Sequence, residues 1–142
     1  MNSQLQKNKI KGFRGYIFSR SIAGNFIPQR VQNLVIRDFA DRFGVFFKLS
    51  STEYNMDNCF LMLNSILKNI NSIDGVIFYS IEMLIEKKDL NNFLKLFIKK
   101  NKLIYFALEE IKIKSINDIK KIKKILKIKK DSMKSNMIKE YV

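Results

Sequence analysis

The sequence predicts an α/β protein with a small parallel sheet of about four strands and helices on both faces. Four short apolar runs alternate with segments in which apolar residues recur at helical spacing. The runs are continuously apolar rather than alternating, which is typical of parallel strands buried on both faces. The 142 residues are enough for one domain of this kind with an additional helix.

The first half of the chain is expected to form two strands and two helices. Phe13–Phe18 is the first predicted strand, and Pro28 suits the first position of the following helix. Gly44 can end that helix in a left-handed conformation, before a second strand at Val45–Leu49 and a polar connection at Ser50–Asn55. The predicted apolar stripe of the first helix consists of Val31, Leu34, Val35, Phe39 and Phe43.

The second helix is expected to be capped by Asn55 or Asp57. Its predicted apolar side consists of Met56, Phe60, Leu63, Leu67 and Ile70. A third strand follows at Val76–Tyr79, and Ser80–Lys88 is a longer connection. The third helix has an apolar stripe made of Leu90, Phe93, Leu94, Phe97 and Ile98. The fourth strand is expected at Leu103–Leu108.

The chain divides into three parts by pattern: a flexible N-terminus at residues 1–11, the α/β domain at 12–112, and a basic amphipathic helix at 113–142. Ser115 or Asn117 can cap the last helix. Its interrupted apolar seam consists of Ile116, Ile119, Ile122, Leu126, Met133 and Met137. Such a seam must pack against the domain or against a second copy, so a homodimer through this helix is expected.

Charge and composition restrict the classes of function. The net charge is +14, and residues 111–142 hold eleven lysines against three acidic residues, a net +8. This tail favours either a solvated lysine face of compositional origin or binding to a polyanion, which can be weak and non-specific binding to nucleic acid or binding to an anionic membrane surface. The chain has no histidine, which excludes histidine-dependent triads and zinc sites, and its single cysteine excludes a disulfide framework. No apolar run is long enough to span a membrane, and a cytoplasmic protein is expected.

Polar side chains follow each predicted strand, at the edge of a parallel sheet where ligands usually bind. Ser19 and Arg20 follow the first strand, Glu53 follows the second, and Glu109 follows the fourth. Arg20 and Glu53 are expected to share one pocket, because their strands are predicted neighbours. Arg20 can bind an anionic group, Glu53 can act as a general acid or base, and Ser19 is a second candidate catalytic residue. Further candidate substrate-binding residues are Asn25, Gln29, Gln32, Asn33, Ser50, Tyr54, Asn58, Tyr79 and Ser80.

Motifs for the common cofactors are missing from the sequence. The first predicted strand is not followed by G-x-G-x-x-G, and there is no G-x-x-x-x-G-K-S phosphate loop. Glu53, Glu82 and Glu109 do not have the spacing of a metal site. We therefore expect neither a cofactor nor a metal.

Five short motifs lie between residues 12 and 112: Arg14–Arg20, Gly24–Asn25, Pro28–Leu34, Ser50–Cys59 and Asp74–Ser80. Together they resemble the sporadic carbohydrate-cluster protein family. That family is known from bacterial gene clusters for surface polysaccharide biosynthesis. The resemblance implies a role in making lipopolysaccharide or capsule.

A second resemblance starts from Tyr16–Ser21 and the glutamines at the start of the first helix. This opening resembles the catalytic domain of the serine recombinases, the resolvases, and with the strand-helix alternation it implies the strand order 2-1-3-4. In that family the third strand leads into a Leu-Asp-Arg-Leu motif, whereas this chain reads Ile81-Glu82-Met83-Leu84. The arginine that supports phosphodiester chemistry is thus a methionine. The nucleophilic serine matches Ser19 or Ser21 only with a shift of one residue.

Three functions follow from these observations. The leading interpretation is a protein of surface-polysaccharide biosynthesis with a candidate site for a sugar or sugar nucleotide at the carboxyl edge of the sheet; whether it is an enzyme acting on that ligand is left open. The first alternative is a nucleic-acid-binding relative of the serine recombinases that lacks strand-exchange catalysis. The second is a non-catalytic scaffold of a glycan assembly pathway.

Overall fold

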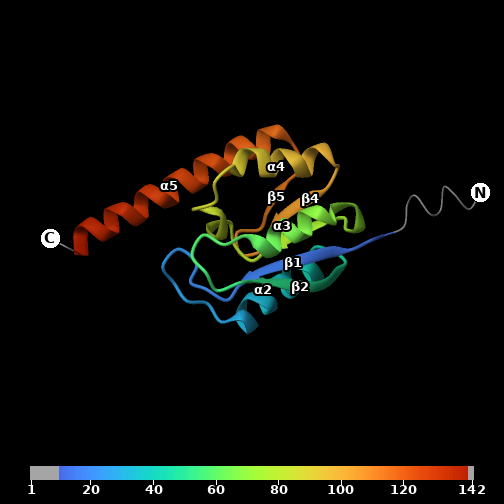
Figure 1. Ribbon diagram of the computed structural model, residues 1–142, viewed down its shortest axis with the longest axis horizontal. Helices are drawn as coiled ribbons and strands as arrows, with labels where there is room; N and C mark the ends of the chain where they lie inside the picture. The colour runs from blue at the N-terminus through green and yellow to red at the C-terminus, as the bar shows by residue number, and fades with distance from the viewer. Residues whose placement is uncertain (1–9, 141–142) are drawn as a thin grey trace, which may run out of the picture.

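A computed structural model describes residues 10–140 of the protein, with side chains described up to residue 134 (Figure 1). Its sheet consists of β1 (Phe13–Phe18), β2 (Phe47–Glu53), β3 (Gly75–Phe78), β4 (Leu103–Phe106) and β5 (Ile111–Ile113). The strand order is β2-β1-β3-β4-β5, and the first four strands are parallel. The predicted α/β class is confirmed.

The prediction of four strands in the order 2-1-3-4 needs correction, because β5 extends the sheet beyond β4. This fifth strand pairs antiparallel with β4 and forms the second edge of the sheet. It contains only three residues, Ile-Lys-Ile, and follows β4 after a tight turn. A segment this short gives no measurable periodicity in the sequence.

Helices cover both faces of the sheet (Figure 1). They are α2 (Gln29–Arg42), α3 (Leu61–Lys68), α4 (Leu90–Lys99) and α5 (Ile116–Glu140), with short 3₁₀ helices η1 (Ile70–Ser72) and η2 (Ile81–Leu84). On one face, Phe39 of α2 packs against Tyr105 of β4, with ring centroids 5.2 Å apart. On the other face, Phe93 of α4 packs against Phe78 of β3 at 6.1 Å. α5 packs outside this second layer, against α4 and η2. None of the helices within residues 10–140 is both long enough and apolar enough to cross a membrane.

Aromatic side chains form the centre of the core between the sheet and α4. The ring of Phe78 lies 5.4 Å from the rings of both Tyr16 and Phe106, on the two neighbouring strands. All three side chains are fully buried. Gly75 is the first residue of β3, and a Cβ atom at this position would collide with the carbonyl oxygen of Leu103. Close pairing of β3 with β4 therefore requires glycine here.

The buried face of α2 differs from the predicted stripe. Gln32, Ile36, Phe39 and Ala40 are buried, whereas Val31, Leu34 and Phe43 are 42%, 58% and 53% exposed. The reason is the side chain of Gln32, whose hydrogen bonds to the backbone of Phe18 fix the rotation of the helix. Spacing of apolar residues alone could not detect this polar contact. The predicted left-handed Gly44 is confirmed, with φ of +66°.

β2 extends further toward its carboxyl end than the predicted Val45–Leu49 and includes the polar residues 50–53. As an edge strand it pairs with β1 alone, so polar side chains can alternate along it. The register shifts between the pairs Phe13–Phe47 and Gly15–Ser50. Lys48 and Leu49 of β2 therefore lie opposite Arg14 alone.

The start of α3 also differs from the prediction. The helix begins at Leu61, and no side chain of its capping residue, Phe60, bonds to the first turn. The predicted caps Asn55 and Asp57 lie in the preceding loop, and the carboxylate of Glu53 satisfies the first amides of α3 instead.

α5 buries the middle of its predicted seam against the domain. Ile119, Ile122 and Leu126 are buried, whereas Ile116 is 56% exposed. Met133 is half-buried, and the side chain of Met137 lies outside the described residues, as does most of the predicted flexible segment 1–11. At the start of the helix, Asp118 accepts hydrogen bonds from the amides of Lys114 and Ser115, at 2.9 and 3.0 Å. These bonds hold the pKa of the Asp118 carboxyl below its usual range.

Candidate functional site

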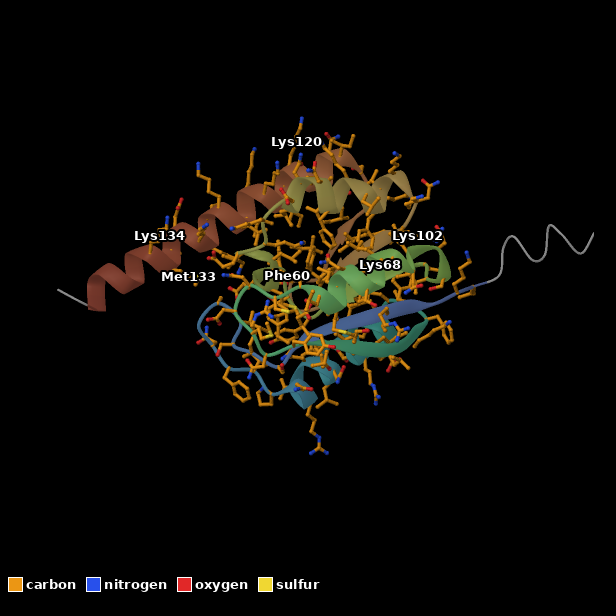
Figure 2. The ribbon with its side chains drawn as sticks, viewed as in Figure 1. Phe60, Lys68, Lys102, Lys120, Met133 and Lys134 are labelled. Atoms are coloured by element: carbon orange, nitrogen blue, oxygen red, sulfur yellow. The ribbon has the colours of Figure 1, made fainter. Side chains whose placement is uncertain are left out.

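The carboxyl ends of β1 to β4 bring most of the predicted site residues to one end of the molecule. Figure 2 labels Phe60 and Met133 at this end, which lies toward the arrowhead of β1 in Figure 1. Ser19 and Arg20 follow β1, Glu53 ends β2, and Ser80 follows β3. The hydrogen bonds of each residue show whether its polar atoms are already bound to other parts of the protein.

Glu53 is 1% exposed, and its carboxylate accepts several hydrogen bonds. The hydroxyl of Tyr16 donates to Oε1 at 2.7 Å, and the amides of Met62 and Leu63 donate at 3.0–3.2 Å. The amide of Tyr54 donates to Oε2 at 3.0 Å. The carboxylate thus joins β1 and β2 to the positive end of α3. Burial, followed by the hydrogen bond to Glu53, raises the pKa of Tyr16, so the phenol stays protonated and remains a donor.

Arg20 lies at the same end but makes different contacts. Its guanidinium carbon is 3.8 Å from the centroid of the Phe18 ring and 5.2 Å from that of Phe60. Its Nη1 donates to the carbonyl oxygen of Tyr54 at 3.3 Å. Arg20 forms no ion pair with Glu53 in the described part of the chain. The expected pocket shared by these two side chains is therefore not found.

A cavity of about 430 Å³, which we call the carboxyl-end pocket, lies beside Arg20. Its lining includes Arg20, Asn58, Phe60, Glu82, Glu86 and Met133. Glu53 does not line it. Asn58 adopts a left-handed conformation with φ of +57°. Glu82 is paired with Lys129 of α5, with Nζ and Oε1 3.2 Å apart. The pocket thus carries charges of both signs.

Two other predicted site residues hold the end of β1 in place. Gln32 is fully buried. Its amide nitrogen donates to the carbonyl oxygens of Phe18 and Ile27, both at 2.8 Å, and its amide oxygen accepts from the Phe18 amide at 2.9 Å. The hydroxyl of Ser19 donates to the carbonyl oxygen of Glu53 at 2.9 Å. A ligand would have to compete with these bonds.

The end of β3 is fixed in the same way by Glu109. Its carboxylate accepts hydrogen bonds from the Ser80 hydroxyl at 2.6 Å and from the Ile81 amide at 2.9 Å. Tyr79 is 6% exposed. Its burial, followed by the charges of Glu109 and Glu82, raises the pKa of its phenol.

The remaining predicted residues are dispersed. Gln29 and Tyr54 are exposed, and Asn33 is half-buried on α2. The side chain of Asn25 donates only to the nearby carbonyl of Ala23, at 3.4 Å. Strand alternation places Ser50 on the face of the sheet opposite Glu53, where its buried hydroxyl has no partner among the described residues. The roles of all these residues in binding or catalysis stay predictions.

Lys87 is a residue at this end that the sequence did not single out. Its Nζ lies 4.8 Å from the centroid of the Phe60 ring and 5.2 Å from that of Phe93. Burial lowers the pKa of its ammonium group. A lysine in a charged run, Glu-Lys-Lys-Asp, gives no sequence signal that distinguishes it from solvated neighbours. Among the described residues, no group of three or more Cys, Asp or Glu side chains could hold a metal ion.

Two solved structures are similar to the chain along most of its length. The N-terminal catalytic domain of TP901-1 integrase superposes with a TM-score of 0.55 at 16% identity, covering 86% of this chain and 97% of that one. A resolvase family site-specific recombinase from Streptococcus pneumoniae superposes with a TM-score of 0.58 at 11% identity, covering 90% and 95%. The fold is resolvase-like. No family model and no curated protein matches the chain, so the resemblance to the sporadic carbohydrate-cluster family rests on the sequence motifs alone.

Proposed function

We propose that this protein binds nucleic acid through α5 and does not catalyse strand exchange. Similarity to an integrase domain and a recombinase supports a nucleic-acid partner. The observation that carries the proposal is the lysine face of α5, which we define by Lys120, Lys123, Lys124, Lys127 and Lys134. Neither solved structure supports a sugar ligand, and nothing in the geometry favours the polysaccharide interpretation over this one.

The lysine face points away from the domain. Its members recur at helical spacing along one side of α5, roughly a third of a turn around the helix from the buried Ile119, Ile122 and Leu126, and all five are exposed. In the described part of the chain, Lys129 is the lysine of α5 that forms an ion pair. Figure 2 shows Lys120 and Lys134 far apart along the helix, on its outer side.

The dimensions of α5 suit a duplex. The helix has 25 residues and is about 37 Å long. Duplex DNA carries one phosphate charge per about 1.7 Å of its axis, so several lysines can contact phosphates at once. Asp131 lies on the same side and lowers the net charge of this face by one.

The catalytic part of the proposal rests on Met83. The resemblance to the resolvases places this residue where their motif has an arginine. Met83 lies in η2 and is 3% exposed. A buried thioether cannot stabilise the charge that develops on a scissile phosphate. We therefore infer binding without strand exchange.

A homodimer through α5 stays a separate prediction. Ile128 is 68% exposed on the side of the helix away from the buried Ile119 and Leu126, which leaves an apolar side chain available to a second copy. Sedimentation of the free protein tests this point without DNA.

The binding test replaces Lys120, Lys124, Lys127 and Lys134 together with Gln. We expect weak binding of wild-type protein to a fluorescent duplex, without sequence preference and lost by about 200 mM salt. If all four lysines contact phosphates, the slope of log Kobs against log salt falls by up to about 3.6 in the variant.

The matched control replaces four exposed lysines elsewhere, Lys48, Lys88, Lys95 and Lys99, with Gln. It changes the net charge by the same amount. An equal loss of affinity in both variants would show that α5 has no special role and would contradict the proposal.

A further inference from the structure

A second pocket, of about 260 Å³, lies at the opposite end of the sheet from the carboxyl-end pocket, between β1, β2 and α3. We call it the amino-end pocket, and its polar lining consists of Arg14, Ser51, Ser65, Asn69 and Ser72. The other lining side chains are apolar, and none is acidic. An arginine and hydroxyl groups without a carboxylate form a lining that favours an anion.

Arg14 is unusual in its position. It is the one charged residue of β1, an inner strand whose other residues are apolar, and it is half-buried. Its guanidinium forms no ion pair or hydrogen bond with any residue of the described part of the chain. Fully buried arginines are almost always paired, because removing their charge from water costs free energy, and a half-buried arginine without a protein partner bears part of that cost. Five N–H donors therefore remain available at the pocket.

Two hydroxyl groups add to these donors. Within the described residues, the side chains of Ser51 and Ser65 have no hydrogen-bond partner. Asn69 and Ser72 differ, because Asn69 donates to the carbonyl oxygen of Ser65 at 3.2 Å and Ser72 donates to that of Asn69 at 2.6 Å. Strand alternation and register place Ser51 beside Tyr16, on the α3 side of the sheet with Arg14. The unused donors thus belong to Arg14, Ser51 and Ser65.

The surroundings of the pocket are basic. Lys68 follows Ser65 by three residues on α3, and Figure 2 shows Lys68 and Lys102 at this end of the molecule. Nζ of Lys11 donates to the carbonyl oxygen of Asn71 at 2.8 Å. Burial, with the nearby charge of Lys11, lowers the pKa of Lys102. The carboxylate of Asp74 is occupied by the amides of Lys11 and Gly12, at 2.9 and 2.8 Å.

We propose that the amino-end pocket binds a phosphate group, as free phosphate or as the phosphate of a small monoester, with Arg14 as its principal ligand. A planar guanidinium matches two phosphate oxygens, and the hydroxyls of Ser51 and Ser65 can donate to the others. The pocket is smaller than the roughly 300–1,000 Å³ of sites that enclose whole ligands. It therefore suits a phosphate whose substituent extends into solvent. This site is separate from the lysine face of α5, and neither proposal depends on the other.

The test is a titration of ¹⁵N-labelled full-length protein with sodium phosphate, with sodium chloride of equal ionic strength as the reference. We expect saturable amide shifts at Ser51, Ser65 and Asn69 that chloride does not produce. Arg14→Gln should weaken this binding at least about tenfold, because the charged donor pair is lost. Arg30→Gln is the matched control, since Arg30 is exposed on α2, on the other face of the sheet, and its removal should leave the affinity unchanged.

Ser65→Ala, with Ser132→Ala on α5 as its control, keeps the test decisive if Arg14→Gln does not fold. Loss of one hydroxyl donor should weaken phosphate binding by about threefold to tenfold. Glycerol phosphate tests the monoester, and tighter binding than free phosphate would identify a monoester as the preferred ligand. Absence of saturable shifts in the folded wild type, shifts confined to α5, or equal effects of Arg14→Gln and Arg30→Gln would each overturn the proposal.

Discussion

At the carboxyl end of the sheet, the carboxylates of Glu53 and Glu109 and the amide of Gln32 all bond to other parts of the chain. At the amino end, the guanidinium of Arg14 has no such partner among the described residues. Both ends carry polar side chains at the edge of one sheet. They differ in whether the hydrogen-bonding capacity of those side chains is used by the fold.

This difference qualifies the rule that ligands bind outside the carboxyl ends of parallel strands. The rule locates polar residues, but a polar residue binds a ligand only with donors or acceptors that folding leaves free. Gln32 shows the point, since its three hydrogen bonds hold the strand end and α2 together. Free capacity at the amino end distinguishes Arg14 from these residues.

The largest expected effect is that of Glu53→Gln at the carboxyl end. The change removes the charge that accepts from Tyr16 and from the α3 amides, and it points an amide NH₂ at these donors. We expect the free energy of unfolding in urea to fall by about 3 kcal/mol. Glu86→Gln, at an exposed carboxylate of the same end, should change it by no more than about 0.5 kcal/mol. Equal stability of the two variants would mean that Glu53 is free for chemistry after all.

An intermediate effect is expected for Gln32→Ala. The backbone groups of Phe18 and the carbonyl of Ile27 lose their partner in a buried place, which should lower the unfolding free energy by about 2 kcal/mol. Gln29→Ala lies in the first turn of the same helix, where the side chain is exposed, and should be nearly neutral. Thermal or urea unfolding measures both. An unchanged unfolding free energy in Gln32→Ala would contradict the contrast between the two ends of the sheet, because this residue would then be available to a ligand.

The smallest effect concerns Lys87 and appears as a pH dependence. Its pKa is lowered in the folded protein, so the unfolded chain binds its proton more tightly. The resulting loss of stability is present at neutral pH and disappears as pH rises through the folded pKa toward the ordinary value of 10.5. The unfolding free energy of wild type should therefore rise relative to that of Lys87→Met between pH 7 and this value. A difference that does not depend on pH would show that Lys87 titrates normally.

The sequence was sufficient for the α/β class, because buried parallel strands such as Tyr16–Phe18 and Val76–Phe78 are continuously apolar. It was insufficient where polar residues belong to a strand or to the buried face of a helix. The polar half of β2 resembled a loop, and the stripe of α2 was misplaced because a buried glutamine lies at its centre. Residues 111–113 are too few to show a period.

For the candidate site, the sequence placed Arg20 and Glu53 at the carboxyl end of the sheet, where the structure has them, but could not show their partners. Whether a carboxylate faces solvent or a helix terminus depends on where α3 begins, and that depends on the fold. Arg14 could have been singled out, because a lone arginine in an apolar strand requires an explanation.

The irregular register of β2 hinders strand pairing between one molecule and another. Free sheet edges invite pairing with another chain, and they lead to fibres or swapped oligomers when long and regular. The extra residue opposite Arg14 interrupts the regular ladder of β2, and Lys48 within that irregular segment adds a charge that another strand would have to bury. The opposite edge, β5, is three residues long and centred on Lys112. Both borders of the sheet are thus protected against aggregation by features unrelated to any ligand.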